Sequence, residues 1–383
     1  MSVNPILPTL THIGEYAVAD FMARFWQQEA YLARQALPEF RPLLDVDDVL
    51  RLSTQEDVES RLIISHDDGS WDVQYGPFAS RMFKKMPASG WTILVQGVNL
   101  WSASVEAFLR QFAFIPYARL DDVMISYAVD GGGVGPHFDS YDVFLLQAYG
   151  QRRWSVGTQE DLTLVQDAPL KILQSFEPEH SWVLDPGDML YLPPRYAHDG
   201  VAVGECMTYS IGFRVPTNQE WGQGFLNFWH DQIDLQSIYQ DAGLKPTDVP
   251  ASIPNALQEH VLQAIGQMLW SKKDIHRFVG CYLTEPKETV FFEPPSRPMS
   301  LKRFTEVCLQ TGLVLDAKTQ MLYDNEAFYC NGEAWPKTTL SEGMQCALCE
   351  LSNLRRLRAE ALESIPELIE FRLYEAYRSG FLR

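Results

Sequence analysis

The sequence predicts an α+β protein whose central part is a barrel or sandwich of short β-strands, and three observations support this fold class. From about residue 91 to residue 214, short runs of Val, Ile, Leu, Tyr and Phe alternate with glycine and proline, as in proteins built from many short strands. Residues 217–279 instead repeat apolar side chains at helical spacing. The remaining residues, 293–383, mix helices with a small hairpin. A chain of 383 residues has room for two or three such domains.

Residues 1–90 are interpreted as an N-terminal α/β extension of the barrel. Apolar residues recur at helical spacing over 20–37, and Pro38 should end this helix. A second helix is expected near Asp45, where several acidic side chains can cap the first turn. Two extended segments within 61–75 flank a polar turn and predict a hairpin.

Residues 91–215 are predicted to form the β-rich core. Turn signals such as Pro186-Gly187-Asp188 separate its candidate strands. The expected strands are 92–98, 122–129, 142–147, 152–156, 181–184, 188–191 and 207–213.

Residues 216–292 are predicted to be helical. Pro254 suits the first position of a helix, and the residues that follow place one apolar stripe on it at steps of four. The stripe consists of Leu257, Val261, Ile265 and Leu269.

Residues 293–383 begin with a proline-rich linker and continue with helices and short strands, which resembles a winged-helix module. Cys346 and Cys349 form a lone C-x-x-C in a stretch that reads as helix. Because no second pair stands at zinc-ribbon spacing, we interpret them as two packed thiols, and the sequence leaves open whether they have a redox role.

The amino-acid composition indicates the cellular compartment of the protein and the chemical class of its binding partners. The chain has 31 Lys plus Arg against 50 Asp plus Glu, a formal charge of −19. A negative surface repels phosphate backbones and anionic membranes, so a basic protein or peptide is a better expectation than nucleic acid, although many proteins are simply acidic. No signal-peptide pattern and no run of about 18 apolar residues is evident, so we expect a cytoplasmic protein without a membrane span.

The residues that indicate a metal site follow a glycine-rich turn at residues 131–135. His137 and Asp139 are two positions apart, so on a strand their side chains point to the same face. His198, after a Pro-Pro turn, is the candidate third ligand. An H-x-D pair alone often arises by chance, but two histidines and one carboxylate on one face of a metal form the facial triad of non-haem Fe(II) oxygenases.

Such iron sites usually bind 2-oxoglutarate, whose far carboxylate needs a basic partner. By strand alternation Arg152, Trp154 and Val156 share the inward face. A buried arginine is costly unless it is paired, and a bound carboxylate would pair it; a protein carboxylate is the alternative. Ser126 and Ser210 lie on candidate strands and can add hydroxyl donors, or can simply be buried hydroxyls bonded to backbone.

Acidic and aromatic residues near the glycine-rich turn are candidates for binding a basic substrate side chain. Asp130 precedes the turn, and Tyr149 follows the next strand. A carboxylate and an aromatic face are suitable partners for such a cation. Equally, Asp130 can be a turn cap and Tyr149 a core aromatic.

Together these segments resemble the bacterial ribosomal oxygenases of the JmjC class, and among them the arginine hydroxylases of large-subunit ribosomal protein sixteen. The resemblance covers most of the chain and is closest over residues 61–214. The segments that carry it are Asp121–Tyr127, Gly131–Asp139, Tyr141–Phe144, Gly150–Trp154, Leu184–Pro194 and Tyr209–Arg214.

The resemblance implies a double-stranded β-helix, also called a cupin or JmjC jelly roll, followed by a helical dimerisation segment and a C-terminal winged helix. It implies Fe(II) at His137, Asp139 and His198, with 2-oxoglutarate held by Arg152 and Ser126. The implied reaction is β-carbon hydroxylation of an arginine in a basic ribosomal protein, without direct nucleic-acid binding. The alternatives are a histidyl hydroxylase or lysine demethylase of the same fold, or a non-catalytic metal-binding cupin.

Overall fold

The computed structural model describes residues 8–66, 68–214, 216–236 and 238–383. The chain divides into two compact units. The first combines the chain up to residue 215 with residues 286–319 and 353–383, and the second combines 216–285 with 320–352. The four predicted domain ranges stay predictions, and their limits at residues 1 and 215 lie outside the described residues.

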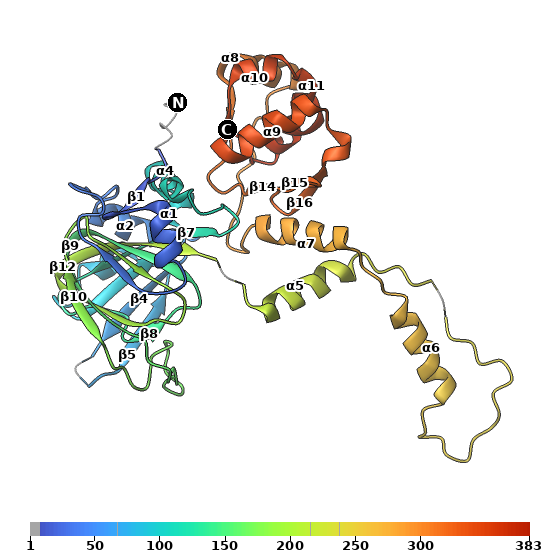
Figure 1. Cartoon of the computed structure of the whole chain (residues 1–383), viewed down its shortest axis with the longest axis horizontal. Helices are drawn as coiled ribbons and strands as arrows, with labels where there is room; N and C mark the ends of the chain where they lie inside the picture. Colours follow the sequence, from blue (N-terminus) through green and yellow to red (C-terminus); the bar gives the residue numbers. More distant parts are fainter. Residues whose placement is uncertain (1–7, 67, 215, 237) are drawn as a thin grey trace. The chain divides into compact units, whose positions relative to one another are not determined.

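An antiparallel β-barrel dominates the first unit (Figure 1). Its hydrogen-bonded strands follow the order β3-β11-β9-β12-β7-β6-β4-β5, while β10 pairs with β9 and β8 pairs with β12. The strands are β3 (Tyr31–Ala33), β4 (Ser60–Ser65), β5 (Trp71–Tyr75), β6 (Trp91–Val95), β7 (Leu120–Ala128), β8 (His137–Phe138), β9 (Asp142–Gly157), β10 (His180–Leu184), β11 (Met189–Leu192) and β12 (Ala197–Phe213).

Strands β9 and β12 are long enough to take part in both halves of the barrel. The segments predicted as separate strands at 142–147 and 152–156 are one continuous strand, so that prediction was wrong. Gly150 lies within this continuous strand at a φ of +61°. A Cβ on Gly150 would lie 1.9 Å from the carbonyl oxygen of Glu205, so glycine permits the close approach of β12.

The N-terminal residues pack on one face of the barrel. Helix α1 (Val18–Arg24) ends well before the predicted Leu37. Residues Tyr31–Ala33 form β3 instead and pair with β11, because the barrel edge offers hydrogen bonds that override local helix preference. The other helices of this region are α2 (Val46–Leu52), α3 (Ser80–Phe83) and α4 (Ala103–Leu109). Asp45 caps α2 as expected, by accepting from the backbone N–H of Asp48.

Two hydrophobic cores stabilise the barrel. The larger joins the N-terminal helices to one face of β7, β9 and β12, and it contains Phe21, Phe112, Phe144 and Tyr209, all fully buried. The smaller contains Val143, Leu145, Trp154, Val156 and Leu190 from β9 and β11. The alternation along β9 is as predicted, with Arg152, Trp154 and Val156 buried.

The remaining elements of the first unit come from its later segments. They are α8 (Leu301–Thr311), β13 (Leu313–Val314), β17 (Arg356–Leu357), α10 (Ala359–Glu363), α11 (Pro366–Leu368) and α12 (Tyr374–Arg378). Strand β13 pairs with β17.

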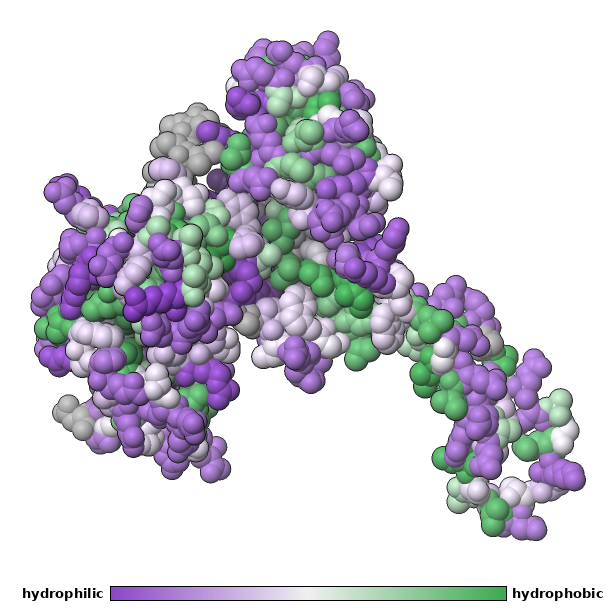
Figure 2. Space-filling model, viewed as in Figure 1, coloured by the Kyte–Doolittle hydropathy of each residue, from purple (hydrophilic) through white to green (hydrophobic). Residues whose placement is uncertain are grey.

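The second unit contains the expected helices and hairpin. They are α5 (Asn218–His230), α6 (Asn255–Gly266), α7 (Lys272–Thr284), β14 (Met321–Tyr323), β15 (Ala327–Cys330), β16 (Glu333–Pro336) and α9 (Glu342–Leu354), which runs on past the unit's end. Figure 2 shows hydrophobic residues on the surface of the part that carries α6. Within the described ranges, no helix combines the length and the apolar character needed to cross a bilayer.

Candidate metal and co-substrate site

Three side chains form the centre of the candidate site. His137, Asp139 and His198 each offer a ligand atom, and these atoms lie within 4.8 Å of one another. The two imidazole centroids are 4.2 Å apart, and His198 Nε2 lies 3.7 Å from Asp139 Oδ2. Nitrogen and oxygen atoms at these separations can share one metal ion, and two imidazoles with one carboxylate suit Fe(II). The geometry therefore fits the group expected from the sequence.

Strand pairing brings the three residues together although 61 positions separate His137 from His198. Strand β8 pairs with the start of β12, and His137 lies directly opposite His198. The chain before β12 turns at Arg195, whose backbone N–H donates to the carbonyl oxygen of Asp139 at 2.7 Å. This bond fixes Asp139, one residue beyond β8, against the segment that carries His198.

The glycine-rich turn lets the chain lie against its neighbours before it reaches β8. Gly131 donates to the carbonyl of Ala202, and Ala202 donates back to Gly132. A Cβ on Gly132 would lie 2.2 Å from the carbonyl oxygen of Trp91. The glycine run therefore positions β8 by close backbone approach.

Hydrogen bonds fix which nitrogen of each histidine is available. His137 Nδ1 lies 2.8 Å from the carbonyl of Gly135, and His198 Nδ1 lies 2.9 Å from that of Tyr196. Since a carbonyl only accepts, each Nδ1 carries the proton and each Nε2 is free to bind a metal. Burial, aided by the neighbouring His137, lowers the pKa of His198 to about 4, which keeps it in the neutral form that metals need.

Arg152 lies on the inner face of β9 with only part of its guanidinium paired. Its Nη1 donates to Ser126 Oγ at 3.0 Å and to Thr208 Oγ1 at 3.4 Å. Its Nε and Nη2 atoms are buried without a hydrogen-bond partner. Burial lowers the pKa of Arg152, but an arginine stays charged in proteins. A buried cation with two unpaired donors fits a carboxylate ligand such as the far end of 2-oxoglutarate.

Two polar residues that were not predicted from the sequence, Thr208 and Gln147, complete the part of the site around Arg152. Thr208 donates to Gln147 Oε1 at 3.0 Å, and Gln147 Nε2 donates to the carbonyl of Tyr149 at 2.8 Å. The chain of bonds fixes Thr208, and Thr208 in turn helps to orient Arg152. No spacing in the sequence indicates that these two strands place their polar residues side by side.

The other predicted residues occupy different positions. Ser210 is buried on the same face of β12 as Thr208. Asp130 is exposed and accepts from the backbone N–H of Gly204 at 2.8 Å. Tyr149 is 43% exposed, and the pKa of Tyr127 rises to about 12 through burial and the nearby Glu205. Asp130, Tyr149 and Glu205 thus lie near the middle of the β9–β12 pair, where its register shifts.

The barrel and the one-sided cluster define the class of double-stranded β-helix oxygenases with a JmjC domain. Residues 107–221 match the JmjC domain family, and residues 267–381 match the ROXA-like winged helix. These matches confirm the expected α+β fold class, with a double-stranded β-helix followed by a C-terminal winged helix.

Comparisons with individual proteins show which family within this class the chain resembles. The chain is 34% identical to the ribosomal protein uL16 3-hydroxylase of Escherichia coli over 82% of this chain and 84% of that protein. It is 32% identical to a probable ribosomal oxygenase of Haemophilus influenzae over 91% of this chain and 82% of that protein. The structure of the E. coli ribosomal oxygenase YcfD in complex with cobalt and 2-oxoglutarate matches with a TM-score of 0.79 at 30% identity, covering 95% and 97% of the two chains. The chain belongs to the ribosomal oxygenase family.

Proposed function

We propose that this protein is an Fe(II)- and 2-oxoglutarate-dependent oxygenase that hydroxylates the β-carbon of an arginine in ribosomal protein uL16. The observation that carries the proposal is the triad His137, Asp139 and His198 beside the partly unpaired Arg152. When bound, Fe(II) would bind and activate dioxygen, which is the oxidant: 2-oxoglutarate would give up two electrons, lose carbon dioxide and take one oxygen atom to become succinate, and the other oxygen atom would enter the substrate as the hydroxyl group. The similarity to the E. coli uL16 3-hydroxylase supports the choice of substrate.

The chain's own residues position the reactants. The triad binds the metal from one side, which leaves the other side for co-substrate, dioxygen and the target carbon. Arg152 and Ser126 hold the far carboxylate, with Ser210 as a further candidate donor, and Thr208 helps to orient the guanidinium. Apolar neighbours such as Val156 and Leu145 exclude water from the inner face, which strengthens each charged contact.

The proposed substrate is basic, and the structure offers matching groups. Asp130, Tyr149 and Glu205 provide two carboxylates and an aromatic face near the middle of the β9–β12 pair, where its register shifts. A guanidinium binds to such groups by paired hydrogen bonds and by stacking. The net charge of −19 attracts a basic ribosomal protein at longer range and disfavours direct nucleic-acid binding. The proposed compartment is the cytoplasm.

We also propose that the chain forms a homodimer through its helical segment. Much of the apolar stripe predicted from the sequence is solvent-exposed: Val261 and Ile265 on α6 are 46% and 59% exposed, and Leu269, which the prediction placed on the same helix but which lies three residues beyond its end, is 79% exposed. Single chains rarely expose apolar residues in such a continuous row, whereas subunit interfaces bury them. A second copy of the same helix would cover the stripe.

Replacement of His137 tests the enzymatic proposal. The variant His137→Ala should lose 2-oxoglutarate turnover, measured as succinate formed with a uL16 peptide, while circular dichroism shows an intact fold. His230→Ala, an exposed residue at the end of α5, is the matched control and should keep full activity. Undiminished turnover by His137→Ala would refute the assignment. Turnover only with histidine or methyl-lysine peptides would favour the other JmjC reactions, and no turnover by the native protein would favour a metal-binding cupin without activity.

A further inference from the structure

The inner face of β9 carries a third unpaired donor close to the two on Arg152. Trp154 is only 6% exposed, and its indole Nε1 is buried without a hydrogen-bond partner. An unpaired N–H in the interior is costly, and most buried polar groups therefore find a partner. Trp91, which is buried to a similar degree, illustrates the usual case, because its Nε1 donates to the carbonyl of Pro87 at 2.8 Å.

Trp154 lies between the two ends of the proposed co-substrate site. The carbon of the Arg152 guanidinium lies 5.6 Å from the centroid of the indole ring. On the other side, the centroids of Trp154 and His198 are 5.9 Å apart. A ligand that reaches from the metal at His198 to Arg152 must therefore pass close to this ring.

Gly200, which lies opposite Trp154, determines which edge of the indole ring lies against β12 and which edge faces away from it. Gly200 pairs with Trp154, and a Cβ on Gly200 would lie 2.6–2.9 Å from the ring atoms Cζ3, Cη2 and Cε3. The benzene edge of the indole therefore lies against β12. The Nε1 atom is on the opposite edge of the ring, so it faces away from the Gly200 backbone.

We infer that Trp154 is a co-substrate-binding residue: its Nε1–H donates a hydrogen bond to 2-oxoglutarate, next to the salt bridge that Arg152 makes. This inference rests on the proposed function. It explains why two donors of Arg152 and the single donor of Trp154 are buried without a partner in the protein. A dicarboxylate brings enough acceptor oxygens for all three, and a hydrogen bond to a charged acceptor is among the stronger ones.

Binding measurements on the Zn(II)-loaded full chain separate this inference from the proposed function. Trp154→Phe keeps an aromatic ring but removes the N–H, and it should weaken 2-oxoglutarate binding about tenfold in calorimetric titration. Trp182→Phe is the matched control, since Trp182 lies opposite Trp154 on β10, and its affinity should stay within twofold of the native value. Native-like affinity of Trp154→Phe would overturn the inference alone. If the native protein does not bind 2-oxoglutarate, the proposed function fails with it.

A second measurement leaves Trp154 in place and decides the case if Trp154→Phe does not fold. The chain has ten tryptophans, and ¹H–¹⁵N spectra resolve their indole N–H groups. The Trp154 resonance is assigned by elimination, from Trp→Phe variants of the others. It should move downfield when 2-oxoglutarate is added to the Zn(II)-loaded protein, and Zn(II) alone should not produce this shift. A Trp154 resonance that 2-oxoglutarate leaves in place would overturn the inference.

Discussion

Two buried aspartates of the barrel show that surroundings decide the state of an acidic residue. Asp188 is buried, and burial by itself would raise its pKa, but donors from Gln35, Asp185 and Arg34 hold the pKa below its usual value. Asp122 is also buried, and there burial and the nearby Asp121 raise the pKa to about 6. Gln96, Gly97 and Lys287 oppose this rise without cancelling it.

The raised pKa of Asp122 predicts a specific pH dependence of stability. Between about pH 4 and pH 6 the folded state binds more protons at this site than the unfolded chain, so its contribution to the free energy of unfolding falls as pH rises. The loss, on the order of 2 kcal/mol, should be complete above pH 7. Asp122→Asn should remove this part of the profile, measured by urea unfolding at pH 4.5 and pH 7.5. Parallel profiles for the native protein and the variant would contradict the prediction.

Among single residues, those whose place in the site depends only on spacing within one strand could be predicted from the sequence. His137 and Asp139 were paired by their two-residue spacing, and Arg152 by alternation, and the structure places these side chains where that reasoning expects. Thr208 and Glu205 were not predicted, because their roles depend on which residues another strand places opposite them, and this register is a property of the folded barrel.

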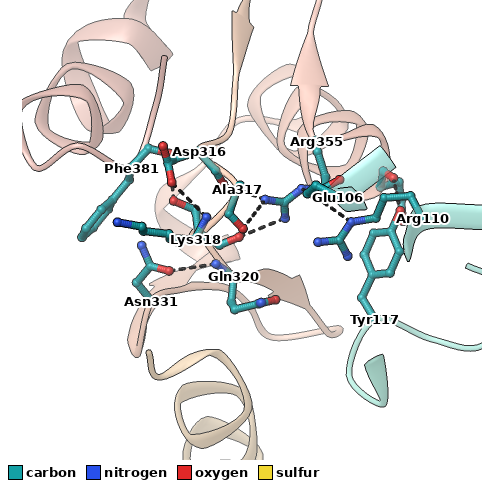
Figure 3. Close-up of polar contacts among 12 residues, drawn as sticks. Glu106, Arg110, Tyr117, Asp316, Ala317, Lys318, Gln320, Asn331, Arg355 and Phe381 are labelled. Atoms are coloured by element: carbon teal, nitrogen blue, oxygen red, sulfur yellow. Dashed lines mark hydrogen bonds and ion pairs between the residues drawn. The ribbon is translucent and has the colours of Figure 1, made fainter. Parts of the chain in front are cut away.

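At the scale of elements, a buried ion cluster fastens helix α4 to the segment before β17 (Figure 3). Glu106 on α4 lies 2.8 Å from the Nε atoms of both Arg110 and Arg355. Arg355 also donates to the carbonyls of Thr319 and Asp316, at 2.9 and 2.7 Å. Burial opposes ionisation of Glu106, but the two guanidinium groups hold its pKa below the usual value. One carboxylate thus neutralises part of the charge of two buried arginines.

Removal of that single negative charge should be strongly destabilising. Glu106→Gln leaves Arg110 and Arg355 buried without a counter-charge, and we expect the free energy of unfolding to fall by about 3 kcal/mol. Glu306→Gln is the control, because Glu306 pairs with Arg303 on an exposed helix face and should cost less than about 1 kcal/mol. Chemical unfolding of the full chain measures both. Equal stability of the two variants would show that the cluster does not fasten α4.

Elements with a strong local signal were predicted well, and elements that depend on distant pairing were not. Helix α2 has its capping aspartate and begins within one residue of the predicted Asp45. Residues 31–33 have helical spacing but become a strand, because β11 offers an open edge. The continuity of β9 across Gly150 likewise depends on its partner β12 rather than on its own residues.

At the scale of the whole molecule, the exposed stripe of α6 contrasts with the acidic surface expected from the composition. A net charge of −19 makes two copies of the chain repel each other. A dimer therefore needs a local apolar contact that outweighs this repulsion, and Leu262, 65% exposed, extends the stripe of α6 to a second row. Salt screens the repulsion and leaves apolar burial largely intact, so self-association should strengthen as ionic strength rises.

A charge placed in the stripe should convert the dimer to a monomer. Ile265→Glu puts a carboxylate where the second copy would bury an isoleucine, and burial of an unpaired charge is unfavourable. We expect sedimentation equilibrium to report twice the chain mass of 43.7 kDa for the native protein and the single chain mass for the variant. Gln263→Glu adds the same charge to the opposite, exposed face of α6, away from the apolar stripe, and should stay dimeric. A native protein that sediments as a monomer at all salt concentrations would contradict the proposed dimer, and an Ile265→Glu variant that stays dimeric would move the interface away from α6.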